Sequence, residues 1–117
     1  MAETHAELIA RARRAYREAH ERLVTRLREA DDEAVHRAPA DGGWSAAQIG
    51  WHVAAVDASF AGLLSGERPG AQPLPDGAPE RSWGEILHAM PARIEAGKRV
   101  QPPPDARRDD VLKLLAD

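Results

Sequence analysis

The sequence contains no cysteine, and this absence excludes disulfide bonds, thiolate metal sites and cysteine nucleophiles. No apolar run approaches the roughly 20 residues that a membrane-spanning helix needs, and the first residues lack the apolar segment of a signal peptide. We therefore expect a cytoplasmic protein that is not embedded in a membrane. The net charge of −3 is mild, which argues against a general nucleic-acid binder.

Large apolar side chains are also scarce. Leu, Ile, Val and Phe together account for 21 of the 117 residues, and much of the remaining apolar content is alanine, which buries little surface. The length and this composition predict one domain, residues 1–117, with a small or incomplete core. Arginine far outnumbers lysine, and Ala, Gly and Pro are frequent, as a GC-rich bacterial genome would produce.

Helix signals dominate what is present, and the clearest of them lie in residues 44–66. Ser45 can cap the first free backbone N–H groups, and Gln48, three residues later, can complete a capping box. Trp44 and Ile49 have the spacing of a hydrophobic staple around this cap. Because Gly66 can adopt the left-handed conformation that closes a helix, we predict a helix from Ser45 to this glycine.

Large apolar residues recur in this helix every three or four positions, so that they share one stripe at about 100° per residue. We expect the stripe to face a helix-lined interior. His52 falls at the edge of the stripe, next to Leu63 in projection, and is the one residue that we single out as a candidate ligand. The stripe consists of Ile49, Val53, Val56, Phe60 and Leu63.

A second long helix is predicted from about His5 to Ala30. Thr4 and Glu7 have the spacing of a capping box, and an apolar stripe runs over seven turns. We expect Glu7 to pair with Arg11, four residues later. The many arginines would suit an anion-binding face, but the glutamates between them favour an ordinary solvated face. His20 lies off the apolar stripe and is expected at the surface.

The rest of the chain is rich in helix-breaking residues. In the loop of residues 31–43, Val35 is expected to turn inward, and a Gly-Gly pair allows the chain to reverse. Residues 67–81 form a Pro/Gly-rich linker. Ser82 starts a short helix that Pro91 interrupts, and a last helical segment begins near Asp109 with its apolar face barely started.

Residues 39–57, PADGGWSAAQIGWHVAAVD, resemble the signature of the DinB/YfiT-like superfamily. That signature has a proline-containing loop, a W-S cap, a glutamine or glutamate in the first helical turn and a histidine one turn later. The resemblance covers the two long helices and the loop between them, a little over half of the chain. It implies an all-α, up-down helical bundle, of which this chain has two long helices, a Pro/Gly-rich linker and one or two short helices and lacks the final helix.

The resemblance also implies a chemistry. In complete members this histidine is one of three that bind a divalent metal, and the other two come from an H-x-x-x-H pair on the last helix. Members include metal-dependent hydrolases and transferases or isomerases that use low-molecular-weight thiols, and many are dimers. His52 matches the first metal ligand, so a zinc or nickel ion and a small-molecule thiol are the implied cofactor and substrate.

The departure from the family pattern lies in the other ligands. The five histidines are never three or four residues apart, so the sequence contains no H-x-x-x-H pair. A catalytic metal needs about three protein ligands and an open position. We therefore expect the chain to be catalytically incomplete by itself. Two alternatives stay open, namely a non-enzymatic helical module that forms a homodimer or binds another protein, and a degenerate member in which His52 is an ordinary core-edge histidine.

Overall fold

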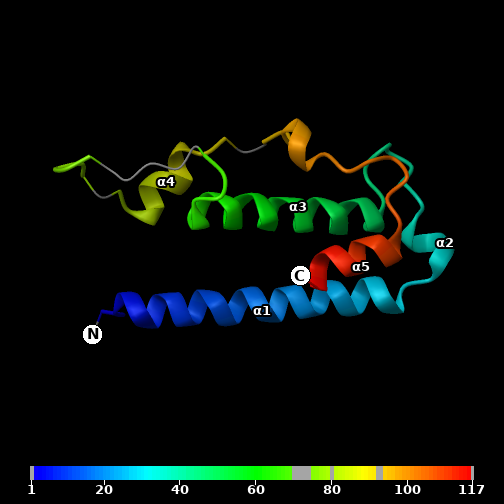
Figure 1. Ribbon diagram of the computed structural model, residues 1–117, viewed down its shortest axis with the longest axis horizontal. Helices are drawn as coiled ribbons and strands as arrows, with labels where there is room; N and C mark the ends of the chain where they lie inside the picture. The colour runs from blue at the N-terminus through cyan, green and yellow to red at the C-terminus, as the bar shows by residue number, and fades with distance from the viewer. Residues whose placement is uncertain (1, 70–74, 80, 92–93, 117) are drawn as a thin grey trace. The chain divides into compact units, whose positions relative to one another are not determined.

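The computed structural model describes residues 2–69, 75–79, 81–91 and 94–116, and this part of the chain is helical without any strand (Figure 1). The predicted all-α class is therefore confirmed. None of its helices is long and apolar enough to span a bilayer. The elements are α1 (His5–Glu29), α2 (Asp32–Val35), α3 (Ala46–Ser65), α4 (Trp83–Ala89), the 3-10 helix η1 (Lys98–Val100) and α5 (Arg108–Ala116).

The residues form two compact units, and the boundary between them falls within α3. The first unit combines residues 1–54 with residues 102–117, and the second unit is made of residues 55–101. The first unit therefore holds α1, α2, the first half of α3 and α5. The second unit holds the other half of α3, α4 and η1.

The predicted ends of both long helices are confirmed by their capping bonds. The Thr4 hydroxyl accepts a hydrogen bond from the backbone of Glu7, whose carboxylate accepts one from the backbone of Thr4. At the start of α3, the Ser45 hydroxyl and the Gln48 side chain accept the reciprocal bonds at 3.2 and 2.9 Å. Gly66, with φ of +85°, follows the last residue of α3, as its left-handed preference predicts.

The predicted pair between Glu7 and Arg11 is wrong. Glu7 is occupied by the cap, and the Arg11 guanidinium instead donates two hydrogen bonds, of 2.9 and 2.8 Å, to the Glu3 carboxylate. These bonds lower the pKa of Glu3 and raise that of Arg11. The small stabilisation from this exposed pair is present at neutral pH and is lost in acid, as the Glu3 carboxylate becomes protonated.

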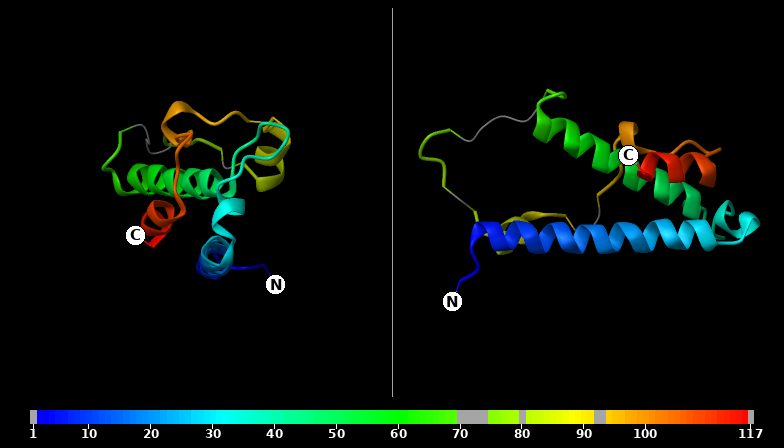
Figure 2. Two further views of the ribbon diagram at one scale, coloured as in Figure 1. Left: turned by 90° about the vertical axis from the view of Figure 1, so that its right-hand side faces the viewer. Right: turned by 60° about the horizontal axis from the view of Figure 1, so that its bottom comes forward.

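The buried core lies in the first unit, where α5 packs beside the C-terminal half of α1. Figure 2 shows this in a view almost along the axis of α1, with α5 next to it. Four side chains form the core, Leu27 from α1, Val35 from α2, and Val111 and Leu115 from α5. Burial of each is worth about 1.5–3 kcal/mol. Val35 turns inward as predicted, within a four-residue helix that sequence patterns did not reveal.

Helix α3 meets this core through small residues. Ala47 and Gly50 are buried, and Trp51 and Ala54 pack against the core cluster from the next turns. Positions 47, 50, 51 and 54 follow the three-and-four spacing of one helix face. A Cβ atom at Gly50 would lie 2.8 Å from methyl groups of both Leu27 and Val111, so any larger residue would force these side chains to shift, and glycine allows the three helices to approach closely.

The prediction that the large apolar stripe of α3 faces the interior is wrong for Ile49 and Phe60, whereas Val53, Val56 and Leu63 are half-buried. Only Val53 of that stripe packs against the core cluster. Ile49 and Phe60 have 46% and 62% of their surface exposed. At Gly50 the physical reason is steric, because Leu27 and Val111 approach the helix too closely for a side chain at that position.

In the second unit, α4 begins after Ser82, whose hydroxyl accepts a hydrogen bond of 3.2 Å from the backbone of Glu85. The helix ends at Ala89, two residues before Pro91, as that proline predicts. After α3, the Arg68 guanidinium donates a hydrogen bond to the Ser59 hydroxyl, so the chain here turns back toward the helix. The middle of the predicted linker, residues 70–74, lies outside the described residues.

Candidate functional site: His52 and the outward face of α3

His52 lies in the first unit, two turns into α3, and is half-buried. Its imidazole packs against the indole of Trp44, with ring centroids 5.0 Å apart and the planes tilted by 50°. Trp44 precedes the helix cap, and the bonds between Ser45 and Gln48 fix the path by which the chain enters the helix. The cap therefore positions an aromatic ring on the candidate ligand.

Gln48 lies one turn before His52 and is committed to structure. Its Oε1 accepts the Ser45 backbone N–H, and its Nε2 donates a 3.3 Å bond to the carbonyl of Pro103. This second bond joins the start of α3 to the segment that leads into α5. Both ends of the Gln48 amide therefore have partners within the protein.

The other histidines lie on different elements from His52. His36 is half-buried at the end of α2, where both ring nitrogens have partners. His20 is also half-buried, with its ring stacked on Tyr16 and its Nδ1 inaccessible, so its predicted surface position is wrong. This part of α1 is partly buried because α5 packs on α1, a contact that the local sequence does not reveal. His5 and His88 are exposed.

A comparison with protein families identifies the superfamily of this chain. A model of the DinB superfamily matches residues 15–117, from the middle of α1 through α5. The chain belongs to the DinB superfamily. The match extends well beyond residues 39–57, the segment that carries the sequence signature. No curated protein and no solved structure matches the chain.

The metal that DinB membership implies does not fit the described residues. Among them, no group of three or more His, Asp or Glu side chains could hold a metal ion. Asp57 is five residues after His52 and about 140° around the helix, so the two are poor co-ligands for one ion. His52, which the sequence signature predicts as the first metal ligand, therefore has no such ligand set around it among the described residues.

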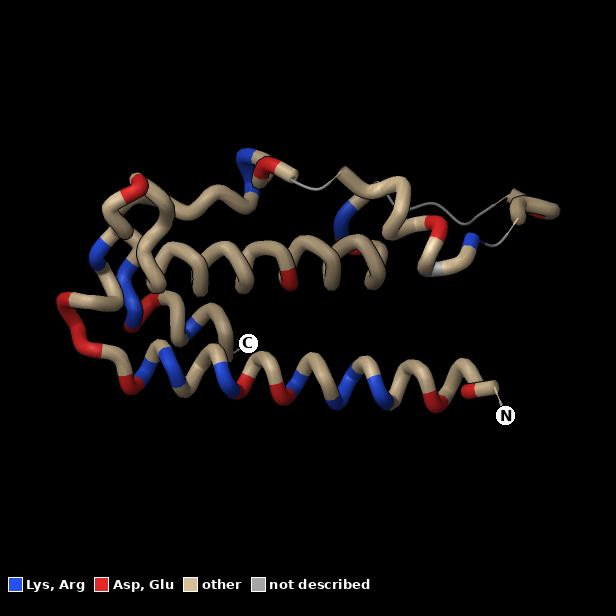
Figure 3. Tube along the Cα trace, turned by 180° about the vertical axis from the view of Figure 1, so that it is seen from behind, with Lys and Arg blue, Asp and Glu red and all other residues tan. Residues whose placement is uncertain are grey.

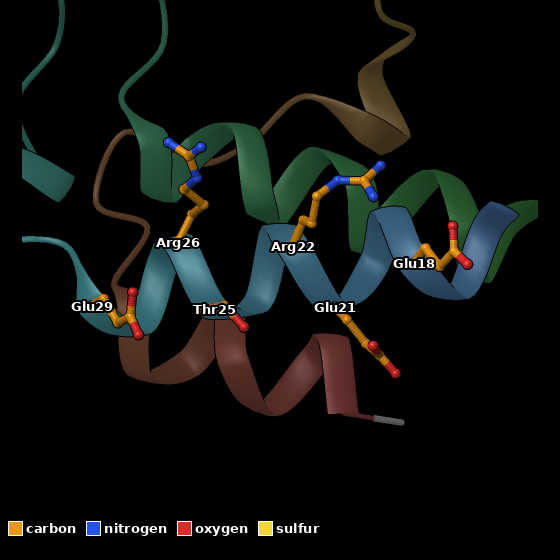
Figure 4. Close-up of a pocket in the computed structure, with 6 residues that line it drawn as sticks. All are labelled: Glu18, Glu21, Arg22, Thr25, Arg26 and Glu29. Atoms are coloured by element: carbon orange, nitrogen blue, oxygen red, sulfur yellow. The ribbon is translucent and has the colours of Figure 1, made fainter.

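Two hollows on α1 also fail to form a site. One lies on its charged face, where Figure 4 shows the side chains of Arg22 and Arg26 on one side and that of Glu21 on the other. All six residues that line it come from α1, and they carry charges of both signs, which is typical of a solvated helix face. The other, of about 440 Å³, is a groove between α1 and α5 that includes His20 and Leu112.

The feature of α3 that stands out is the side opposite to its small residues. Ile49, Val56, Phe60 and Leu63 lie within about 60° of one another around the helix, and we call them the outward face. Asp57 is the only charged residue among the 20 of α3. Figure 3 shows the contrast, because α1 alternates between the two signs of charge whereas α3 is almost without charge.

Proposed function

We propose that this DinB-superfamily chain is a helical association module, and that a second copy of the chain packs on the outward face of α3. The observation that carries the proposal is the exposure of large apolar side chains on an almost uncharged helix. Phe60 is 62% exposed, and Leu64, beside the outward face, is 87% exposed. A helix with apolar residues on every side is expected to be buried on every side. Helix α3, however, contacts the core cluster through one side.

A second copy fits this face better than a charged partner does. An interface that forms around a twofold axis brings the same patch of each chain together, so the patch must be complementary to itself. An apolar face satisfies this condition, since it brings no like charges into contact. A different partner is usually selected by complementary charges, and the outward face of α3 carries none.

The size of the face sets the expected affinity. A helix of this length spans about 30 Å, so contact along one side of it lies at the small end of specific interfaces. We therefore expect a reversible dimer with a dissociation constant on the order of micromolar.

A single introduced cysteine tests where the two copies meet, because the chain has none of its own. Val56 lies at the middle of α3, where a twofold axis through the helix would bring the two copies of this residue together. We expect Val56→Cys to form a disulfide-linked dimer under mild oxidation, and Thr25→Cys, on the charged face of α1, to stay monomeric in denaturing electrophoresis. Equal cross-linking of both variants, or none at Val56→Cys, would contradict the proposal.

A metal-dependent activity of the hydrolase or thiol-transferase type is the second candidate, and DinB membership together with His52 favours it. In this second candidate, a second copy supplies the ligands that the described residues lack. Association would then depend on a divalent metal and on His52. In the proposed module it depends on neither, which separates the two candidates experimentally.

A further inference from the structure

A histidine bridges two segments that are 72 residues apart in the sequence. His36 follows α2, and its Nε2 lies 3.0 Å from the backbone nitrogen of Arg108, the first residue of α5. Its Nδ1 lies 2.7 Å from the carbonyl oxygen of Asp32. The backbone N–H of Arg108 can only donate, so Nε2 must accept. The proton of the ring is then on Nδ1 and is donated to the Asp32 carbonyl.

The side chain of Arg108 makes a second set of contacts between the same segments. Its guanidinium donates to the carbonyl of Ala30, the residue that closes α1, and lies 3.4 Å from the Asp32 carboxylate. The start of α5 is thus held against the end of α1 and against α2 by one imidazole and one guanidinium. All of these residues belong to the first unit.

From this geometry we infer that His36 is an acid-sensitive clasp for α5. The clasp is closed when the imidazole is neutral. Protonation of Nε2 removes the acceptor, places two N–H donors opposite each other at 3.0 Å and adds positive charge at the N-terminus of α5, where the helix dipole is already positive. Histidine is the side chain whose unperturbed charge change falls between about pH 5 and pH 8, which makes an imidazole suited to such a clasp.

Charged groups of both signs lie around the clasp. The Asp32 carboxylate lies 3.7 Å from Nδ1 and favours the protonated ring, but its side chain is 69% exposed and solvent weakens its effect. The Arg108 guanidinium and the lost hydrogen bond disfavour the protonated ring. Other charged groups on the three elements include Glu33, paired with Arg37 beyond α2, Asp109, Asp110 and Lys113 on α5, and Arg26, Arg28 and Glu29 in the last turn of α1.

Release of α5 would have a specific consequence. Val111 and Leu115 are the buried residues of α5, and they cover Leu27 and Val35. Opening the clasp therefore exposes the centre of the small core. The helix has only nine residues, too few to be stable in water without this packing.

Hydrogen exchange of the wild-type chain at about pH 8 and about pH 5, corrected for intrinsic rates, tests the clasp directly. We expect the protection of the backbone amides of Val111–Leu115 to fall about tenfold in acid, the factor that one lost hydrogen bond carries. His36→Gln keeps an acceptor for the Arg108 N–H but cannot be protonated, and we expect its α5 protection to be the same at both pH values.

His88→Gln is the matched control, because His88 is exposed on α4. We expect this variant to lose α5 protection in acid as the wild type does. Constant protection in the wild type would overturn the inference. So would an equal loss in His36→Gln, or a loss that disappears in His88→Gln.

Discussion

Replacement of Phe60 by glutamate is expected to convert the protein from a reversible dimer into a monomer with the same helix content. The side chain is 62% exposed in the single chain, so the fold does not depend on it. In a twofold dimer the exposed part of two copies of Phe60 is buried, which contributes about 2–4 kcal/mol in total. Loss of this burial and the cost of desolvating two carboxylates should weaken association more than about 100-fold.

The matched control for this change is Ala58→Glu. Ala58 is exposed on the same helix, two residues before Phe60 and therefore about 160° from it around the helix axis. Light scattering after size exclusion would report the mass of each variant, and circular dichroism would report its helix content. We expect Ala58→Glu to remain dimeric. A dimeric Phe60→Glu, or two variants that dissociate alike, would show that the copies do not meet on the outward face.

Replacement of Gly50 by leucine should unfold the first unit. A Cβ atom at this position already approaches the methyl groups of Leu27 and Val111 to 2.8 Å, and both of these side chains are buried. Forcing extra methylenes into a well-packed core costs typically about 1–3 kcal/mol and occasionally more, and leucine adds four carbons. The expected loss, above about 3 kcal/mol, is a large share of the stability of a small domain. Urea unfolding followed by circular dichroism measures it.

Alanine substitutions separate this steric effect from the general effect of removing a helical glycine. In Gly50→Ala the clash outweighs the gain of about 1 kcal/mol in helix propensity, so we expect a net loss of stability. Gly84→Ala, in α4, adds a Cβ that lies 3.8 Å from the Ser82 hydroxyl oxygen, an ordinary contact distance, and is expected to keep or increase the helix content. Gly50→Leu with an unfolding midpoint at or above that of the wild type would disprove the close approach of the three helices.

The helix boundaries could be predicted from the sequence because capping is a local interaction. Thr4 with Glu7 and Ser45 with Gln48 are three residues apart, and each pair makes its bonds without help from the rest of the chain. The short helix α2 was missed because four residues are too few to show a periodic pattern. The inward position of Val35, on this helix, could nevertheless be predicted, because Val35 is an apolar residue among polar ones.

The buried face of α3 could not be predicted from apolarity, which ranks Phe60 and Ile49 above Gly50. The packing depends on how closely α1 and α5 approach, and that distance is a tertiary property. Helix periodicity identified a set of residues on one side of α3, but the structure packs the core against the other side. A sequence pattern that gives weight to small residues would have identified the buried face, through positions 47, 50 and 54.

The site was predicted only as far as the sequence signature reaches. His52 lies on a helix, as predicted, and is half-buried, but its contact with Trp44 depends on how the chain enters the helix. The role of His36 requires Arg108, which lies 72 residues away and carries no motif that links the two. A partner that comes from a distant segment leaves no local pattern.

The molar mass of the wild-type chain in sedimentation equilibrium, at micromolar concentrations and with or without zinc, tests the proposed association most directly. The account predicts a mass that rises toward twice 12.7 kDa with concentration, is independent of zinc and is unchanged in His52→Ala. A mass of one chain at every concentration would contradict it. A dimer that forms only with zinc and is lost in His52→Ala would also contradict it and would favour the metal-dependent alternative.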